Sequence, residues 1–438
     1  MPSGQEARIA ARPNTEIAVG GDARAVLSLS ALLSGVAILV LGNGLQGTLL
    51  GVRAGIEGMA AETIGLIMSA YFVGFAVACF VVPPLVERVG HIRTFAALAS
   101  IASAIALAHA IFVTAAVWIL LRIAQGACYA GLIMVIESWL NASTGRRHRG
   151  RVLATYSVVL YAAWALSQPM LSVAPPSDFV LFCVVSICLS LALVPITLMG
   201  SGGPGFVTAS RTGLRRLYQI SPVGLVGALA VGAVTGAVLG MGPTFAQNNG
   251  LSDFGISAFM GLTIGGALAL QWPLGMLSDH VGRRPVMLAS CLAAGAASLG
   301  LTFAAQESLP LLFALSFLFG GFSVPMYSLA VAHVNDHIEA DELIAAASSL
   351  VLLYGAGAAI GPFGASLAMG RLGPPGLFGF AAVILFAFAG FTVFRMVKRR
   401  PLARELRDRF VGVPSTTHAH LPLHRHSTGR APGEAAPG

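Results

Sequence analysis

Two charged residues stand inside long apolar stretches of this sequence, where an ion is costly. Arg122 lies within "WILLRIAQGACYAG" and Glu137 lies within "IMVIESWL". Ionisable residues in such surroundings are rare and usually functional, because each needs a compensating partner. An arginine cannot release its proton, so Arg122 can hold an anion or shift the titration of a neighbouring group. Glu137 can either carry a proton or join an ion pair.

Two short polar segments have the residue types of an electrostatic latch. The segment "GMLSDHVGRRP" places Asp279 four residues before Arg283. A carboxylate at a helix end and an arginine one turn later can form charge-assisted hydrogen bonds. Gly275 would let two helices approach closely, and Gly282 would permit a tight turn. The segment "PPLVERVGHIR" is a degraded copy. We therefore expect gating or charge-relay positions at Asp279, Arg283, Arg284, Gly275, Gly282, Glu87, Arg88, Gly90 and Arg93.

The two segments belong to an internal repeat. Glu87 and Asp279 are 192 residues apart, which is close to half of the apolar region. A looser second match pairs Gly126 with Gly320 at an offset of 194 residues. Such a repeat predicts two similar halves in parallel orientation.

The elements that position these residues follow from composition. The 438 residues are 56% hydrophobic and 10% charged, whereas a soluble domain carries about 25% charged residues. This composition excludes a cytosolic enzyme and a disordered protein, and it predicts an all-α integral membrane protein. About 20 apolar residues cross the hydrocarbon of a bilayer. Twelve such runs are present, at 26–50, 63–84, 93–113, 116–140, 151–173, 178–199, 221–245, 255–277, 285–305, 308–332, 344–369 and 374–396.

The basic residues predict the orientation of these spans. Nearly all of them lie in the two tails and in every second loop, while the other loops hold only Arg53 and Arg371. Cytoplasmic loops carry such an excess. We therefore attribute the net charge of +8 to membrane topology rather than to nucleic acid. The prediction is a multi-pass protein of the bacterial inner membrane with both termini cytoplasmic. Its expected parts are an N-terminal tail 1–25, a six-helix bundle 26–199, a linker 200–220, a second six-helix bundle 221–396 and a disordered basic, His-rich tail 397–438.

These motifs resemble those of the major facilitator superfamily over residues 26–396. The signature loop of that superfamily is similar to "GMLSDHVGRR", and its second motif is similar to "RIAQGACYAG", with Arg122, Gln125 and Gly126 in place. The segment "ESWLNA" followed by "RGRVLATY" resembles the YcaD-type branch. The resemblance implies two parallel-repeat bundles, gating by the loop residues, and a link between Arg122 and proton coupling. The first loop departs from the pattern, with Glu87 for aspartate and His91 at an arginine position.

Glu137 lies within one turn of the arginine-rich segment after the fourth run. An ion pair with Arg88 or Arg93 is the favoured interpretation, and proton carriage by Glu137 is the alternative. An ion pair there would compensate for the degraded first loop.

The resemblance also implies a central cavity lined by spans one, four, seven and ten with their neighbours. A single polar or aromatic residue in a span more often bonds a neighbouring helix than a ligand, so we expect about half of the candidates to contact substrate. An apolar cavity with a few such groups suits a neutral or amphiphilic small molecule. The candidates are Arg122, Gln125, Tyr129, Asn43, Gln46, Trp164, Gln168, Gln271, Tyr327 and Tyr354.

The eleventh run contains "YGAGAAIGPFGAS". Small residues at this spacing pack helices closely. We therefore interpret Gly355, Gly357, Gly361 and Pro362 as helix packing and a hinge.

The expected function is secondary transport of a small organic solute by alternating access, coupled to protons, with export preferred. Import by symport or uniport is the alternative, and a non-transporting receptor or structural protein is a third class. The spans lack the paired carboxylates or metal ligands of an intramembrane enzyme, so no cofactor, no metal and no catalysis are expected. We expect a monomer. The His-rich tail could bind a metal, although a solvated tail is the simpler interpretation.

Overall fold

The computed structural model describes residues 21–143, 149–198, 214–338 and 342–398, together with Phe410 and Gly412. These residues form α-helices and one short 3₁₀ helix, with no strand among them. The first half contains α1 (Gly21–Ile56), α2 (Ala61–Val89), α3 (His91–Ile111), α4 (Ala115–Ser143), α5 (Arg149–Ser167), η1 (Gln168–Val173), α6 (Val180–Leu191) and α7 (Leu193–Thr197). The second half contains α8 (Leu214–Ile220), α9 (Pro222–Asn248), α10 (Asp253–Val281), α11 (Arg283–Glu307), α12 (Leu309–Ser323), α13 (Met326–Asn335), α14 (Leu343–Leu372) and α15 (Gly376–Lys398).

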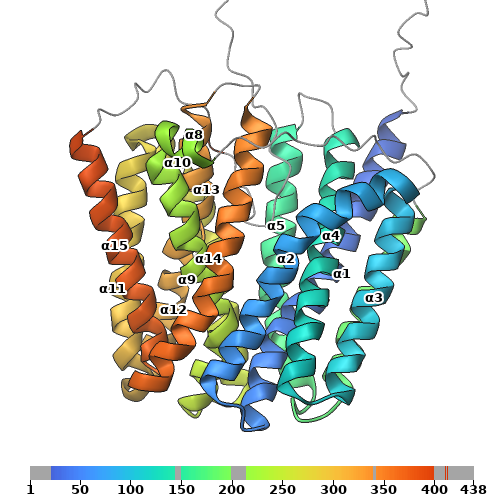
Figure 1. Cartoon of the computed structure of the whole chain (residues 1–438), viewed down its shortest axis with the longest axis horizontal. Helices are drawn as coiled ribbons and strands as arrows, with labels where there is room; N and C mark the ends of the chain where they lie inside the picture. The colour runs from blue at the N-terminus through green and yellow to red at the C-terminus, as the bar shows by residue number, and fades with distance from the viewer. Residues whose placement is uncertain are drawn as a thin grey trace, which may run out of the picture.

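The helices form two bundles that stand side by side, and the described chain begins and ends at the same end of the molecule (Figure 1). Eleven helical segments of the described residues are long and apolar enough to cross a membrane. This confirms the all-α membrane architecture. These eleven segments coincide with eleven of the twelve predicted spans. The fifth predicted span, 151–173, is α5 followed by η1, which contain more charged and polar residues.

Two other predicted spans are interrupted helices. The run 178–199 contains α6 and α7. The run 308–332 is divided into α12 and α13, and Pro325 lies at the break. A proline inside a helix removes a hydrogen bond and clashes with the preceding turn, so it ends or kinks the helix.

The two halves repeat the same close helix packing. Gly74 and Gly126 lie where α2 meets α4, each against the partner's backbone, at Ile123 and Tyr71 respectively. Gly266 and Gly320 lie in the same way where α10 meets α12. A Cβ atom at any of the four glycines would overlap the backbone of the neighbouring helix. Gly74 and Gly266 are 192 residues apart, and Gly126 and Gly320 are 194 residues apart, which are the offsets of the internal repeat. The repeat therefore preserves helix packing as well as loop motifs.

Two further glycines make the latch loops tight. Gly90 follows the last residue of α2 with φ of 86°, and Gly282 follows the last residue of α10 with φ of 117°. The next helix begins at the following residue in both places. Residues with side chains rarely adopt these angles, so glycine permits the helix-to-helix turn without a linker.

Contacts between the bundles lie at the end away from the termini. The Ser69 hydroxyl of α2 accepts a bond from the backbone N–H of Phe363 in α14 at 3.2 Å. Gln247 of α9 donates to the carbonyl of Val52 in α1 at 3.2 Å. Ser172 of η1 and Ser257 of α10 are 3.3 Å apart. Each pair lies in the part of its helices that is far from the chain termini, so the bundles are joined there.

Candidate functional site

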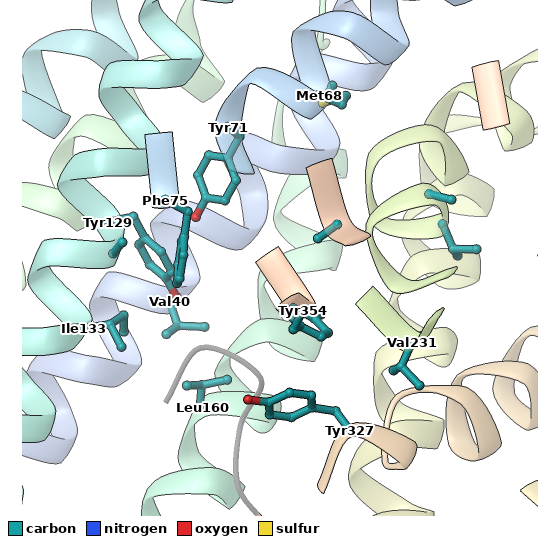
Figure 2. Packing of buried hydrophobic residues seen from close by; sticks show 14 of the residues in the cluster. Val40, Met68, Tyr71, Phe75, Tyr129, Ile133, Leu160, Val231, Tyr327 and Tyr354 are labelled. Atoms are coloured by element: carbon teal, nitrogen blue, oxygen red, sulfur yellow. The ribbon is translucent and has the colours of Figure 1, made fainter. Parts of the chain in front are cut away.

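A cavity of about 110 Å³ lies between the two bundles. Its walls come from α1, α2, α4 and α5 on one side and from α9, α10 and α14 on the other, with no lining residue from α12 or α13. Figure 2 shows the rings of Tyr71, Phe75 and Tyr129 on one side of this region and those of Tyr327 and Tyr354 on the other. The cavity therefore lies where the two repeats face each other.

Arg122 is a buried cation in the wall of this cavity, with 5% of its surface exposed. Its guanidinium carbon lies 4.3 Å from the centre of the Tyr71 ring, and its Nη2 lies 4.0 Å from the Met68 sulfur. Its Nε has no hydrogen-bond partner in the described part of the chain. The Tyr71 hydroxyl donates to Asn43 at 3.4 Å. No carboxylate of the described residues forms an ion pair with Arg122.

The close packing of α4 on α2 explains this geometry. Because Gly126 meets the Tyr71 backbone directly, the two helices approach closely one turn beyond Arg122. The guanidinium then lies over the aromatic face of Tyr71, an arrangement in which the ring quadrupole attracts a cation. The ring contributes no negative charge, so the site keeps its formal charge of plus one.

Half of the predicted cavity residues line the cavity. These are Asn43, Arg122, Tyr129, Trp164 and Tyr354. Gln168 instead accepts a 2.6 Å bond from Thr48 and donates to Ser167. Gln46 and Gln125 are fully buried, and their amide groups have no partner in the described part of the chain. Tyr327 packs edge-on against Tyr354, with ring centres 4.9 Å apart. The remaining candidate, Gln271, lies beside Gly412.

The sequence analysis missed the contribution of α2. Met68, Tyr71, Phe72 and Phe75 all line the cavity. They belong to an apolar run in which nothing distinguishes a cavity wall from a lipid-facing surface. Tyr71 alone offered a signal, because it places a hydroxyl in the middle of a span.

Glu137 is 2% exposed and accepts a hydrogen bond from the Tyr156 hydroxyl of α5 at 3.2 Å. Arg88 and Arg93, its predicted ion-pair partners, have exposed side chains at the ends of α2 and α3. The ion pair therefore stays a prediction, and one observed partner of Glu137 is a tyrosine of the neighbouring helix.

The second latch loop is a buried ionic cluster. Arg283 is 3% exposed and donates to Asp279 at 2.5 Å, to Ser278 at 2.6 Å and to Asp336 of α13 at 3.2 Å. Arg284 approaches His333 of α13 at 3.4 Å. The sequence analysis did not identify Asp336. Its position, a carboxylate four residues after the end of the tenth apolar run, was a usable signal. The cluster joins α10, α11 and α13.

The first latch loop has neutral contacts at the equivalent place. His91 follows Gly90 as Arg283 follows Gly282, and its Nε2 lies 3.0 Å from the Ser138 hydroxyl of α4. Its ring lies 5.9 Å from that of Trp139. The side chains of Glu87, Arg88 and Arg93 are exposed.

Phe410 and Gly412 contact the second latch loop and the opposite bundle. The backbone N–H of Phe410 donates to both carboxylate oxygens of Asp279, at 3.0 and 3.1 Å. The Phe410 ring fills the space beside Gly275, where a Cβ atom would overlap it. The expectation that Gly275 brings two helices together is therefore corrected, since it accommodates this ring. Ser157 of α5 donates to the Gly412 carbonyl at 2.9 Å.

The glycines of α14 have different surroundings. Gly357 and Gly361 lie against the backbone of α9, at Leu229 and Ala233. Gly355 lines the cavity instead. Pro362 lies inside α14 and packs against Gly240 of α9.

The structure offers little for redox or metal chemistry. All five cysteines are free thiols. Within the described ranges, no group of three or more His, Cys, Asp or Glu side chains could hold a metal ion. The His-rich tail that could bind a metal lies outside the described residues.

Comparison with known proteins supplies the family. The family model of the Major Facilitator Superfamily matches residues 32–270 and 223–425. The chain is 27% identical over 360 residues to the uncharacterized MFS-type transporter YcaD of Escherichia coli, across 82% of this chain and 93% of that protein. It is 26% identical over 359 residues to the uncharacterized MFS-type transporter Ent638_1421 of Enterobacter sp. (strain 638), across 82% and 93%.

Two solved structures share the fold. The nucleoside transporter NupG superposes with a TM-score of 0.72 at 12% identity, covering 85% of this chain and 100% of that one. A bacterial homologue of the human lysosomal transporter Spinster, in an inward-facing and occupied conformation, gives a TM-score of 0.68 at 14% identity, covering 85% and 96%. Together with the two repeated bundles and the central cavity, these matches show that this chain is a membrane transport protein, not an enzyme, and belongs to the Major Facilitator Superfamily.

Proposed function

We propose that this protein moves a small organic solute by alternating access, coupled to protons, and that it exports the solute. The observation that carries the proposal is the central cavity, which lies between two bundles whose helices bond each other at the end away from the chain termini. Alternating access needs a site that one side of the membrane reaches at a time. Rocking of the two bundles about these contacts opens the cavity to one side of the membrane at a time.

The basic residues supply the orientation in this proposal. Arg88, Arg93, Arg283 and Arg284 lie at the end of the molecule where the described chain begins and ends. Because basic loops remain in the cytoplasm, both termini are cytoplasmic and the bonded ends of the bundles face outward. The protein acts as a monomer in the bacterial inner membrane, with the two bundles at 26–199 and 221–396 as the moving bodies.

We assign proton coupling to Glu137 and Arg122, and thereby take the alternative interpretation of Glu137, proton carriage, in place of the ion pair; the Tyr156 hydroxyl donates to this carboxylate. Glu137 is the one buried carboxylate in the described helices α1 to α7. A carboxylate can bind and release a proton, whereas the guanidinium of Arg122 keeps its charge. Glu137 and Arg122 belong to the same helix, α4. A movement of α4 thus changes the surroundings of the proton site and of the cavity together.

The test uses inverted membrane vesicles that contain the protein. The vesicles are energised, the lumenal pH is followed with a dye, and a panel of small organic compounds is added. Compound-specific proton release supports proton-coupled export. We expect Arg122→Ala and Glu137→Gln to abolish it, and Arg371→Gln to leave it intact. Arg371 is the matched control because it is an arginine with an exposed side chain in the last turn of α14.

Other outcomes decide between the alternatives. Tracer uptake without proton release would end the export proposal in favour of symport or uniport. If Asp279→Asn left every measured behaviour unchanged, the gating role would be wrong and a non-transporting receptor would be favoured. If Glu137→Gln kept full coupling, the proton site would lie elsewhere and the ion pair with Arg88 or Arg93 would become the better interpretation.

A further inference from the structure

We infer that the cargo carries one negatively charged head group on an apolar body, and that the head group binds Arg122. This inference rests on the proposed function, since it takes the central cavity as the transport site. It narrows the substrate from a neutral or amphiphilic molecule to a monoanionic amphiphile.

The first step is the uncompensated charge of Arg122. The side chain is 5% exposed, and its Nε is without a partner in the described structure. Glu137, the nearest buried acid along α4, is 15 residues away, or about 22 Å along the helix. A buried charge without a partner is strongly unfavourable. An anion entering the cavity would restore the missing charge and hydrogen bond together.

The second step is the geometry around the guanidinium. Tyr71 covers one face of the group at 4.3 Å from the ring centre. The Tyr71 hydroxyl is directed to Asn43, whose amide also lines the cavity. The N–H groups at the edge of the guanidinium can therefore donate to a ligand while the Tyr71 ring covers one face of the group. Planar anions such as carboxylates match this arrangement of donors.

The third step is the rest of the wall. Phe72, Phe75, Leu160, Leu239 and Met260 line the cavity and offer only apolar surface. Arg122 is the one basic residue among the lining residues, and no acidic residue lines the cavity. A dianion would lack a second cation, and a cationic cargo would meet a like charge. The lining therefore fits one negative charge and an apolar remainder.

The experiment compares three ligands that share one body. Isothermal titration calorimetry on the full-length protein in nanodiscs is performed with 4-phenylbutyrate, 4-phenylbutyramide and 4-phenylbutylamine. A hydrogen bond to a charged group contributes about 1.5–3 kcal/mol, so we expect the anion to bind about tenfold or more tighter than the amide. The amine should bind weakest.

Two variants assign the preference to Arg122. Arg122→Gln should reduce the ratio of anion to amide affinity to about one, and Arg122→Lys should restore part of it. Arg371→Gln removes the same charge from an exposed position and should leave the ratio unchanged. Equal binding of anion and amide by the unaltered protein would overturn the inference, as would an unchanged ratio in Arg122→Gln. Because the assay measures binding alone, retained anion binding in a protein without transport would refute the proposed function and not this inference.

Phe410 and Gly412 bridge the two bundles at the end where the described helical chain begins and ends. Phe410 is bonded to Asp279 of α10, and its ring lies 6.0 Å from the Arg283 guanidinium carbon. Gly412 is bonded to Ser157 of α5 and lies against Gln271 of α10. These contacts join the first bundle to the latch loop of the second. We also infer that Phe410 and Gly412 form an inhibitory strap, which must leave before cargo can exchange at this end.

Ser157 is 5% exposed and donates to the Gly412 carbonyl. If the strap covers this end, weakening it should expose Ser157 to solvent. In a cysteine-free background, Ser157→Cys is labelled with a membrane-impermeant maleimide in inverted vesicles. Adding Phe410→Ala should raise the labelling rate several-fold. Phe394→Ala, which removes an equally large ring from an exposed position on α15, should not. Equal labelling rates with and without Phe410 would overturn the strap.

Discussion

The loop between α2 and α3 and the loop between α10 and α11 follow the same backbone path but use different chemistry. Each turns at a glycine with positive φ, Gly90 or Gly282, and each places the next residue against a helix of its own bundle. His91 meets the hydroxyl of Ser138 at 3.0 Å, whereas Arg283 meets two carboxylates and a serine. The contact described for His91 joins two uncharged side chains, whereas Arg283 belongs to a buried ionic cluster.

This difference shows that the repeat preserves helix packing more strictly than charge. The glycine contacts between α2 and α4 recur between α10 and α12 with the same backbone overlap. A methyl group at such a place has no room, whereas a hydrogen bond tolerates several partners. In our proposal, the ionic cluster of the second bundle, where Phe410 also binds, supplies electrostatic gating.

The largest effect should come from breaking the ionic cluster. Asp336→Ala removes a buried partner of Arg283 and should destabilise the protein by about 3 kcal/mol, because the arginine loses charge compensation. The measurement is the free energy of unfolding by SDS titration in mixed micelles. Glu87→Ala in the first loop changes an exposed carboxylate and should cost at most about 0.5 kcal/mol. Equal losses in both variants would show that the loops are energetically equivalent.

A smaller and symmetric effect should follow from the packing glycines. Gly126→Ala and Gly320→Ala each force a methyl group into a backbone contact, at Tyr71 and Thr263. Overpacking of this kind costs about 1–3 kcal/mol, and we expect similar losses for the two variants in the same titration. Gly379→Ala on α15 has open space around it and serves as the control. A large loss in one bundle alone would contradict the packing symmetry.

The smallest effect should come from giving the first loop the chemistry of the second. His91→Arg combined with Ser138→Asp places an ion pair where a neutral contact stands. A double-mutant cycle should give a favourable coupling of about 1 kcal/mol. Each single variant should be destabilising, because each leaves a buried or half-buried charge without its partner. Additive single effects would mean that the two positions do not meet.

Much of the fold could be predicted from the sequence, because its signals are local. Apolar runs longer than about 20 residues fix the membrane helices, and Pro325 marks the break between α12 and α13. The signal is weakest at α5, whose arginines and polar residues dilute the apolar run. The repeat was readable because two loops share glycines at one offset.

The site was less predictable, since its walls depend on which helix faces meet. Tyr71 and Phe75 were overlooked because an apolar span has the same composition on its cavity side and its lipid side. Gln168 was assigned to the cavity but bonds Thr48. Gly275 was assigned to helix packing but accommodates Phe410, a residue 135 positions later in the chain.

The sequence by itself determined that this protein is a two-bundle membrane transporter with a buried arginine and one intact latch motif. Composition and spacing indicate these features, because charge and unpaired polar backbone are costly in hydrocarbon. Each membrane segment must therefore be apolar by its own local sequence. Only the tertiary structure decided that Arg122 lies over Tyr71 without an acid, that Asp336 completes the latch, and that Phe410 and Gly412 join the bundles. Those contacts join helices far apart in sequence, and their energies depend on distance and burial that no local pattern encodes.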